Sequence, residues 1–221
     1  MTFQRARSEE QREIRRRAIL DTAAAMLHEM PVAEVSLNEL SRRVGLAKSN
    51  VLRYFESREA VLLELLDDFL GSWLAELADE LAAGIDAQAA PEVRADRLAE
   101  ILSRSLAERV VLCDLFGAQG GVLERNVSVE VVKRHKRCSL ARLAAMVDLM
   151  RRHLPELGDD AQLFCLMSLV SAGALSAYFP PPPSVLAAYA DDPALGVLDT
   201  ELRDALRHSF TAALVGVLPR T

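Results

Sequence analysis

The chain has few residues that break helices, because its 221 residues include only 10 glycines and 9 prolines, and four of those prolines stand together at Pro180–Pro183. Long stretches therefore lack helix punctuation, and no segment alternates apolar and polar residues as a strand does. Hydrophobic residues make up 51% of the chain and charged residues 26%, which excludes a disordered or collagen-like protein. These features predict an all-α protein that buries a sizeable core.

Cysteine is also scarce. Cys113, Cys138 and Cys165 are odd in number and widely spaced, and none forms a pair with the spacing of a zinc finger. The N-terminus carries charges where an export signal needs an apolar run. We therefore expect a cytoplasmic protein without a metal ion or cofactor. The uncharged run at 163–179 is interrupted by serines and favours a buried helix over one that crosses a membrane.

The charge is unevenly distributed along the chain. The net charge is -6, but residues 1–60 carry +2 and residues 61–221 carry -8. An acidic chain does not coat nucleic acid, whereas a basic head on an acidic body can meet a polyanion through the head alone. The charge pattern therefore predicts that contact with DNA is confined to the N-terminal part.

Apolar periodicity predicts two helices at the start of the chain. The first runs from Glu9 to Met30, where Pro31 ends it. Ser36 to Glu39 form a capping box, which predicts that a second helix begins at Ser36. Gly45 ends that helix because glycine adopts a positive φ without steric cost.

A short third helix at Ala47–Arg53 and a long fourth helix at Ser57–Gly84 follow. The fourth is about 40 Å long at 1.5 Å per residue, enough to connect two domains. Further helices are expected near 91–109, 111–124, 127–153, 159–179, 184–190 and 198–218.

Residues 36–53 have the order of a helix-turn-helix: a capped helix, a turn with glycine, and a short helix with a polar outer face. Lys48, Ser49, Asn50 and Arg53 lie on that outer face and can donate hydrogen bonds to bases or phosphates. An ordinary solvated helical hairpin is the alternative reading of this window alone.

A wider set of residues resembles the N-terminal domain of tetracycline-repressor-type (TetR) transcription regulators. The resemblance covers about residues 14–66, and its segments are Arg17–Leu20, Ala23–Ala24, Val35–Leu40, Val44–Lys48, Tyr54–Phe55, Ser57–Glu59 and Leu62–Leu63. It implies a helix-turn-helix head at 1–56 that binds a near-palindromic operator as a dimer, and a helical body at 57–221 that binds a small effector and dimerises. The implied function is that of a ligand-responsive regulator, expected to be a repressor and not an enzyme.

The resemblance and the hydrogen-bonding chemistry of the side chains together give a set of candidate DNA-contacting residues: Ser36, Arg42, Lys48, Ser49, Asn50, Arg53, Tyr54 and Arg58. Ser49 stands where the family often has glycine, and Leu52 replaces a frequent phosphate-binding tyrosine. Arg53 and Tyr54 stand where the family has an aromatic residue and a histidine, so the readout of the bases is expected to differ. Arg58 matches a common phosphate-contacting lysine. Arg42, Arg43 and each arginine of Arg15–Arg17 either add electrostatic contacts to DNA or belong to a solvated face.

The body offers apolar and sulfur-bearing residues for an effector cavity, of which about a third are expected to touch a ligand. They are Phe69, Trp73, Leu77, Leu102, Leu106, Cys113, Phe116, Met146, Met150 and Cys165. The segments near 159–179 and 198–218 are apolar and suit the dimer interface of the family, with an intramolecular core as the alternative. Small residues at Ala172, Gly173, Ser176 and Ala177 let another helix approach closely.

The body shows no catalytic motif, and His135 and His153 are expected on solvent-facing helix surfaces, with an anion or pH site as the alternative. Two other functions remain open at this point. One is an all-α enzyme or carrier for a hydrophobic small molecule with an idle helix-turn-helix, and the other is a helical scaffold that only dimerises. The enzyme lacks a recognisable nucleophile and base, and the scaffold leaves the basic face from Lys48 to Arg58 without a role.

Overall fold

The computed structural model describes residues 2–196 and 200–217. All the regular secondary structure of these residues is helical, as the sequence predicts. The α-helices are α1 (Thr2–Glu29), α2 (Leu37–Val44), α3 (Lys48–Val51), α4 (Arg58–Gly84), α5 (Pro91–Ala107), α6 (Val110–Ala118), α7 (Val129–His153), α8 (Ala161–Ser176), α9 (Pro183–Asp191) and α10 (Leu202–Val217). Shorter turns are η1 (Val32–Glu34), η2 (Gln119–Leu123), η3 (Glu124–Asn126), η4 (Pro155–Asp160) and η5 (Pro193–Leu195). No helix among these residues is long and apolar enough to cross a membrane.

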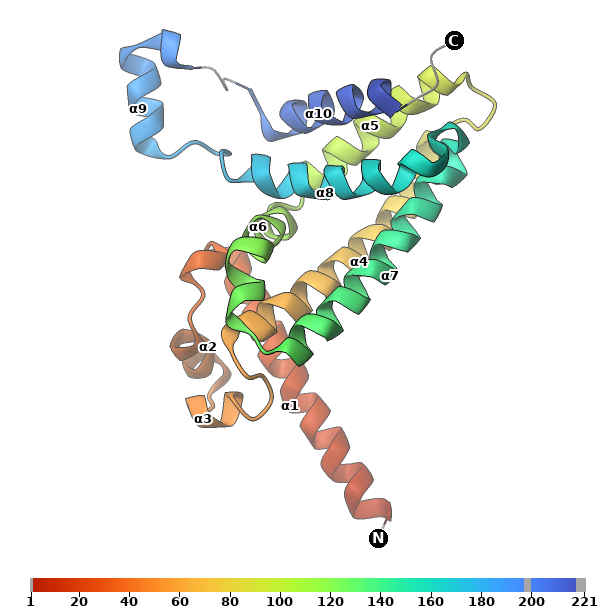
Figure 1. The fold of residues 1–221 in the computed structure, drawn as a ribbon. Helices are drawn as coiled ribbons and strands as arrows, with labels where there is room; N and C mark the ends of the chain where they lie inside the picture. The colour runs from red at the N-terminus through yellow and green to blue at the C-terminus, as the bar shows by residue number, and fades with distance from the viewer. Residues whose placement is uncertain (1, 197–199, 218–221) are drawn as a thin grey trace.

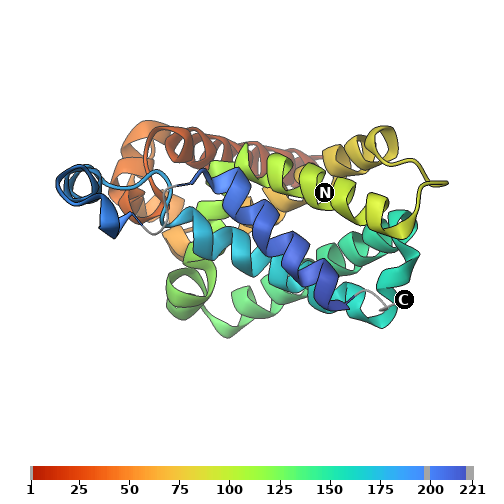
Figure 2. The ribbon, with the colours of Figure 1, turned by 90° about the horizontal axis from the view of Figure 1, so that it is seen from above.

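The molecule is divided into a head and a body (Figure 1). The C-terminal half of α1, together with α2 and α3, forms the head, and α4 rises from it into the body beside α7. At the far end α5, α10 and α8 lie side by side, as Figure 2 shows from above. The order of elements matches a helix-turn-helix head joined by a long helix to a helical body.

Several predicted boundaries differ from the observed ones. α1 begins at Thr2 instead of Glu9, because the polar residues before Glu9 include no glycine or proline to stop a helix although they lack apolar periodicity. α3 ends at Val51, and tighter hydrogen bonds such as Tyr54 N to Val51 O continue the turn toward Phe55. The predicted segment at 111–124 is divided into α6 and the π-helical turn η2. Residues 198, 199 and 218 of the predicted last helix lie outside the described residues.

The helices α6 and α8 touch at two glycines. A Cβ atom on Gly173 would lie 2.6 Å from the backbone nitrogen of Gly117, and one on Gly117 would lie 2.8 Å from the carbonyl oxygen of Gly173. Ala172 and Gly173 are buried in this crossing. This part of the small-residue pattern therefore serves packing within the chain.

Replacing Gly173 with alanine is expected to force α6 and α8 apart and to reduce the free energy of unfolding by about 1–3 kcal/mol, the usual range for overpacking. Gly121→Ala is the matched control, because nothing lies within 4 Å of the position of its Cβ. Chemical denaturation of both variants measures the effect. Equal stability of Gly173→Ala and the unmodified protein would contradict the close approach of the two backbones.

Candidate functional site

Helix α2 is held in place by the local signals that its sequence carries. Ser36 Oγ accepts a hydrogen bond from Glu39 N at 3.2 Å, and Gly45 ends the helix with φ 73°. The return half of the predicted capping box is absent from the hydrogen bonds of the described residues, since the Glu39 side chain binds Arg42 and Arg43 instead. Leu40 is buried on the inner face, which fixes the turn beneath α3.

The start of α3 presents a polar, basic surface to solvent. Lys48, Ser49 and Asn50 are exposed, and so is Arg53 just after the helix. Val51 and Phe55 point inward and are 0% and 3% exposed, so the apolar side of this short segment anchors it to the head. The predicted outer face is therefore free to enter a groove of DNA.

Arg42 and Arg43 share the carboxylate of Glu39. Arg42 Nη2 lies 2.6 Å from one carboxylate oxygen, to which Arg43 Nε also donates at 2.8 Å, and Arg43 reaches Glu29 as well. The hydrogen bonds from Arg42 and then Arg43 lower the pKa of Glu39 to about 2. The side chain of Arg42 remains 72% exposed, so it keeps donors available for a phosphate.

Arg58 is only partly exposed, although its match to a phosphate-contacting lysine implies a side chain that is free to reach DNA. Its guanidinium donates to the carbonyl oxygens of Val35 and Ala33 and forms an ion pair with Glu59, and its side chain is 23% exposed. These backbone acceptors lie far back in the sequence, so local spacing does not reveal them. Arg58 joins η1 to the start of α4, and contact with a phosphate would require it to share or leave these partners.

The arginine cluster of α1 is directed partly toward α4. Arg16 forms an ion pair with Glu64 and lies over the Phe55 ring, 4.8 Å from its centroid, whereas Arg17 pairs with Asp21 and Asp68. Arg15 is exposed. Two of the three arginines therefore tie the head to the long helix.

A groove of about 480 Å³, called here the Trp73 groove, opens where α1, α4 and the start of α6 meet. Its lining combines an apolar floor with charged residues at the rim: Leu27, His28, Phe69, Ser72, Trp73, Glu76, Glu108, Arg109, Val110, Val111 and Leu112. Of the predicted ligand-binding residues it contains Phe69 and Trp73.

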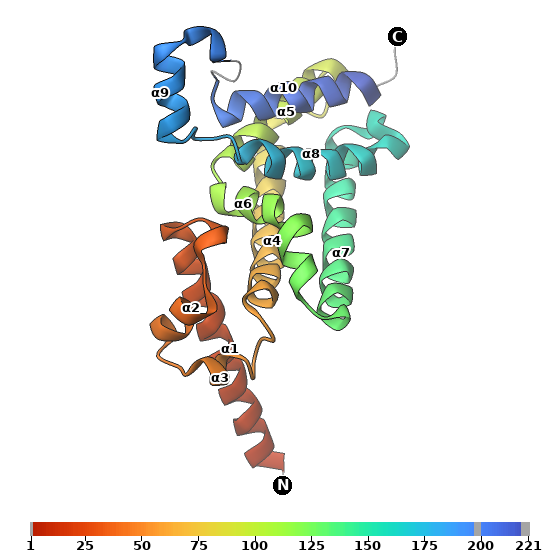
Figure 3. The ribbon, with the colours of Figure 1, turned by 60° about the vertical axis from the view of Figure 1, so that its left-hand side comes forward.

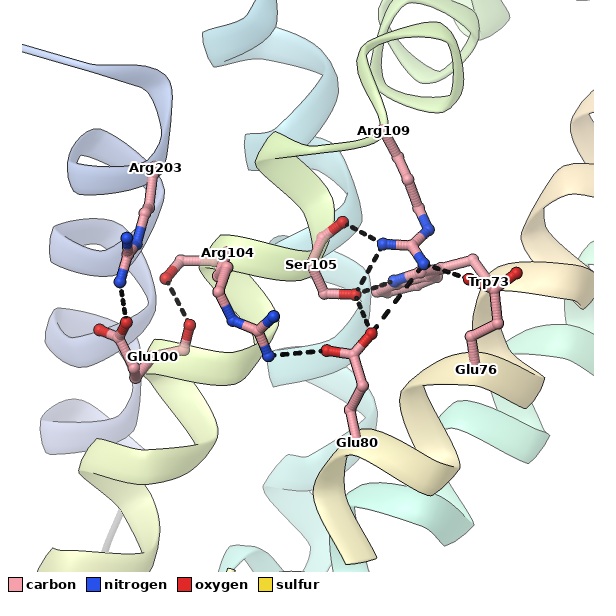
Figure 4. Close-up of polar contacts among 9 residues, drawn as sticks. Trp73, Glu76, Glu80, Glu100, Arg104, Ser105, Arg109 and Arg203 are labelled. Carbon is pink, nitrogen blue, oxygen red and sulfur yellow. Dashed lines mark hydrogen bonds and ion pairs between the residues drawn. The ribbon is translucent and has the colours of Figure 1, made fainter. Parts of the chain in front are cut away.

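Trp73 is held by a network of hydrogen bonds and ion pairs between α4, α5 and the start of α6 (Figure 4). The indole nitrogen of Trp73 donates to Ser105 Oγ at 3.0 Å, and Arg109 Nη1 donates to the carbonyl oxygen of Ser105 at 2.6 Å. Arg109 also forms an ion pair with Glu76, while Arg104 binds Glu80 at 2.9 Å. Trp73 is 1% exposed, so the ring is held in one orientation at the edge of the groove.

The other predicted ligand-binding residues divide into two groups. Phe116 lines a second groove of about 380 Å³ between α4, α7 and α8. The remaining seven are fully buried and line neither groove: Leu77, Leu102, Leu106, Cys113, Met146, Met150 and Cys165. Burial raises the pKa of Cys113 and of Cys165 to about 12, so both thiols stay protonated. These seven residues serve as core of the body.

His135 is buried, which corrects the expectation of a solvent-facing side chain. It is 2% exposed, its Nε2 lies 3.1 Å from Gln119 Nε2 and 3.6 Å from Glu124 Oε1, and its Nδ1 lies 3.0 Å from Asp67 Oδ1 without the alignment of a hydrogen bond. Asp67 and Glu124 belong to α4 and η3, so local sequence gives no sign of them. His135 joins α7 to both elements. His153 is half-buried, and burial and then Arg152 lower its pKa.

The head meets the body through a small number of polar contacts. Val32 N donates to Asp114 Oδ2 of α6 at 2.8 Å, and Ser128 N at the start of α7 donates to Glu56, just before α4. Asp114 and Glu56 are not recognisable from local sequence, because each binds a partner more than 70 residues away. Together with α4, these contacts join the head to α6 and to the start of α7.

An exposed helix-turn-helix on a helical body defines the fold of a one-component bacterial regulator, and comparison with known families agrees. A model described as bacterial regulatory proteins of the tetR family matches residues 19–65, and one described as the C-terminal domain of tetracyclin repressor-like proteins matches residues 67–221. The chain belongs to the TetR family.

Curated relatives match mainly in the head. The chain is 44% identical over 50 residues to the HTH-type transcriptional regulator EthR of Mycobacterium tuberculosis, which is 23% of each chain. It is 27% identical over 92 residues to the regulator BetI of Rhizobium meliloti, 42% of this chain and 43% of the relative. The matches thus span about a quarter of EthR and less than half of BetI.

Solved structures match over the whole fold. The fatty acid degradation regulator FadR of Bacillus halodurans is 14% identical, with 93% of this chain and 97% of that chain covered and a TM-score of 0.55. FadR of Thermus thermophilus, solved in complex with lauroyl-CoA, is 19% identical, with 93% and 96% covered and a TM-score of 0.54. At these identities the likeness concerns the fold.

The lowered pKa of Glu39 gives a pH test of the head. A carboxyl whose pKa is lower in the folded than in the unfolded protein stabilises the fold above its ordinary pKa, and this contribution is lost as the pH falls. We expect the stability advantage of the unmodified protein over Glu39→Gln to decline between pH 4.5 and about 2. Denaturation of both proteins across this range measures it, and a constant difference would show that the arginine pair does not hold the carboxylate ionised.

Proposed function

We propose that this protein is a ligand-responsive transcription regulator that binds a near-palindromic operator as a homodimer and represses transcription until a largely hydrophobic effector releases it. It acts in the cytoplasm, where the operator lies. The observation that carries the proposal is the exposed, basic face of Lys48, Ser49, Asn50 and Arg53 on a head whose inner face is buried. Family membership supports it, because the matched head model describes bacterial regulatory proteins.

Contact with DNA divides into base readout and phosphate binding. Lys48 and Arg53 are long donors at the start and end of the exposed face, which suits guanine or phosphate contact in a major groove. Ser36, Arg42 and Tyr54 flank this face, and Arg42 keeps most of its surface free. Arg58 contributes by holding η1 against α4, with phosphate contact as an added role when it shares its partners.

The homodimer is proposed to form through α8 and α10. Leu163, Leu166, Met167 and Val170 lie at helical spacing on α8 and are 45% to 54% exposed, and Val215 of α10 is 68% exposed. A contiguous apolar stripe of this kind on a protein surface marks a contact with another chain. Two subunits related by a two-fold axis would pack these faces together, which covers both stripes and places the two heads on the same side of the dimer.

The effector is proposed to bind in the Trp73 groove. This groove touches the head through α1, the long helix through Phe69 and Trp73, and the body through the start of α6. α6 in turn holds the head through the Asp114 to Val32 hydrogen bond. A ligand that separates α1 from α6 tilts α4 and changes the spacing of the two heads, which must fit half-sites about 34–36 Å apart or a multiple of this.

The apolar floor of the Trp73 groove suits an acyl chain or another hydrophobic group. A structural neighbour bound to lauroyl-CoA gives a first probe for this ligand class. The rim offers Arg109 and His28 for an acidic headgroup, while Glu76 and Glu108 restrict how many negative charges fit.

Operator binding provides the first test of the function. In gel-shift titrations with the DNA flanking its own gene, Lys48→Ala and Arg53→Ala are each expected to weaken binding by about 1–3 kcal/mol. For the unmodified protein, the logarithm of the binding constant should fall with the logarithm of the salt concentration, with a slope of about -0.9 for each phosphate neutralised. Arg97→Ala, which removes an exposed arginine from α5, is the control and should bind normally. Binding by Lys48→Ala and Arg53→Ala equal to that of the control would refute the proposed interface, as would the absence of any binding, which an idle helix-turn-helix predicts.

Coupling between effector and operator provides the second test. Lauroyl-CoA titrations followed by Trp73 fluorescence should give a Kd that is about 5- to 150-fold weaker when operator is bound, because allosteric coupling is reciprocal at about 1–3 kcal/mol. Ser72→Phe fills the groove, so it should weaken binding of lauroyl-CoA and leave binding of the operator unchanged. Ala75→Phe, one turn further along α4 and outside the groove, should change neither. A ligand that binds equally with and without operator would show that the groove is not the regulatory site for that molecule.

A further inference from the structure

Helix α9 stands away from the rest of the molecule. It is joined to the C-terminal end of α8 and leads through η5 toward α10, and Figures 1 and 3 both show it beyond the edge of the body. None of its nine residues is buried. The segment 177–196, called here the α9 arm, therefore adds almost no core to its own chain.

The composition of α9 does not suit a helix in water. Between Ser184 and Asp191 all six residues are apolar or aromatic, Val185, Leu186, Ala187, Ala188, Tyr189 and Ala190. Val185 and Tyr189 are half-buried, while Leu186 is 52% exposed. Isolated helices shorter than about 12–15 residues are marginal in water, so a helix of this length needs a packing partner.

The position of the arm indicates which partner it has. The arm leaves the C-terminal end of α8, the helix on which Leu163, Leu166, Met167 and Val170 form the exposed stripe of the proposed dimer face. The arm therefore begins at one end of the helix that carries this face. A second copy of the chain that binds to the dimer face would therefore lie beside the arm.

Symmetry gives the direction in which the arm reaches. Two heads that bind one DNA duplex point to the same side, so the two-fold axis runs from body to head and crosses α8, which lies across that direction in Figure 1. The two copies of α8 then run antiparallel. The C-terminal end of α8, from which the arm leaves, faces the N-terminal end of the other α8, where Leu163 and Met167 are 54% and 47% exposed.

Charge agrees with this placement. Asp191 at the end of α9 has no ion pair among the described residues, and neither has Arg152 near the end of α7, which η4 joins to the start of α8. In the antiparallel arrangement the arm of one copy lies at the same end of the dimer as the start of the other α8. The acidic end of one arm is then complementary to a basic residue of the other copy.

We propose that the α9 arm packs on a second copy of this chain, with Leu186 against the N-terminal half of the other α8, so that each subunit clasps the other. The inference rests on the proposed dimer and adds to it a contact outside the α8 and α10 stripe. The clasp fixes the relative orientation of the bodies, because it adds contacts far from the two-fold axis.

The test measures dimerisation and protection of the arm in the full chain. Sedimentation of Leu186→Asp should give a dimer Kd about tenfold weaker or more, since a buried unpaired carboxylate costs well over 1.4 kcal/mol. Val129→Asp, which alters a residue that is 67% exposed at the start of α7, is the matched control and should dimerise normally. Amide hydrogen exchange in residues 183–191 should be slow above the dimer Kd and fast below it.

The outcomes separate this inference from the dimer itself. A chain that stays monomeric at every concentration would overturn both. A normal dimer in which Leu186→Asp associates like Val129→Asp, and in which the arm amides exchange equally fast above and below the dimer Kd, would overturn the clasp alone. Slow exchange of the arm in the monomer would also overturn it, because the arm would then be covered by its own chain.

Discussion

α4 buries apolar residues against the head near its start and against the body farther along, so both units are packed on the same helix. Near its start, Val61, Leu62 and Leu65 are buried, and farther along Leu77 and Leu81 are fully buried in the body. All of these residues belong to one continuous core that extends from Ile19 to Leu214. Since a close-packed core transmits displacement, the head and body cannot move independently of α4. The long helix is thus part of both units and not a tether between them.

The remaining links between head and body are polar and few. Asp114 accepts a hydrogen bond from Val32 N, and Glu56 accepts one from Ser128 N. Glu64 and Asp68 form ion pairs with arginines of α1. The first two are hydrogen bonds from backbone N–H groups, and the last two are partly exposed ion pairs, which contribute about 0–1 kcal/mol of stability each. The apolar contacts keep α4 in both units, and the polar contacts join its neighbours to it. The Trp73 groove, where the effector is proposed to bind, lies between α1, α4 and the start of α6.

Local sequence signals predicted the features that depend on neighbouring residues. Ser36 and Ser57 cap α2 and α4, Gly45 takes a positive φ, and the outer face of α3 is exposed. Features that depend on distant residues were missed. His135 is buried because Asp67 and Glu124 approach it from other elements, and Arg58 turns inward toward carbonyl groups of η1. The predicted cavity residues such as Leu77 and Met150 are apolar as core residues are, and composition does not distinguish a cavity wall from a core.

We propose that occupancy of the Trp73 groove sets the spacing of the two heads through α4. Spin labels at Asn38→Cys, an exposed position of α2, in a Cys138→Ser background measure that spacing by pulsed electron paramagnetic resonance. We expect one narrow distance distribution on operator DNA and a displaced distribution with lauroyl-CoA or whichever probe binds at Trp73. The same distribution in the free, operator-bound and ligand-bound protein would contradict it.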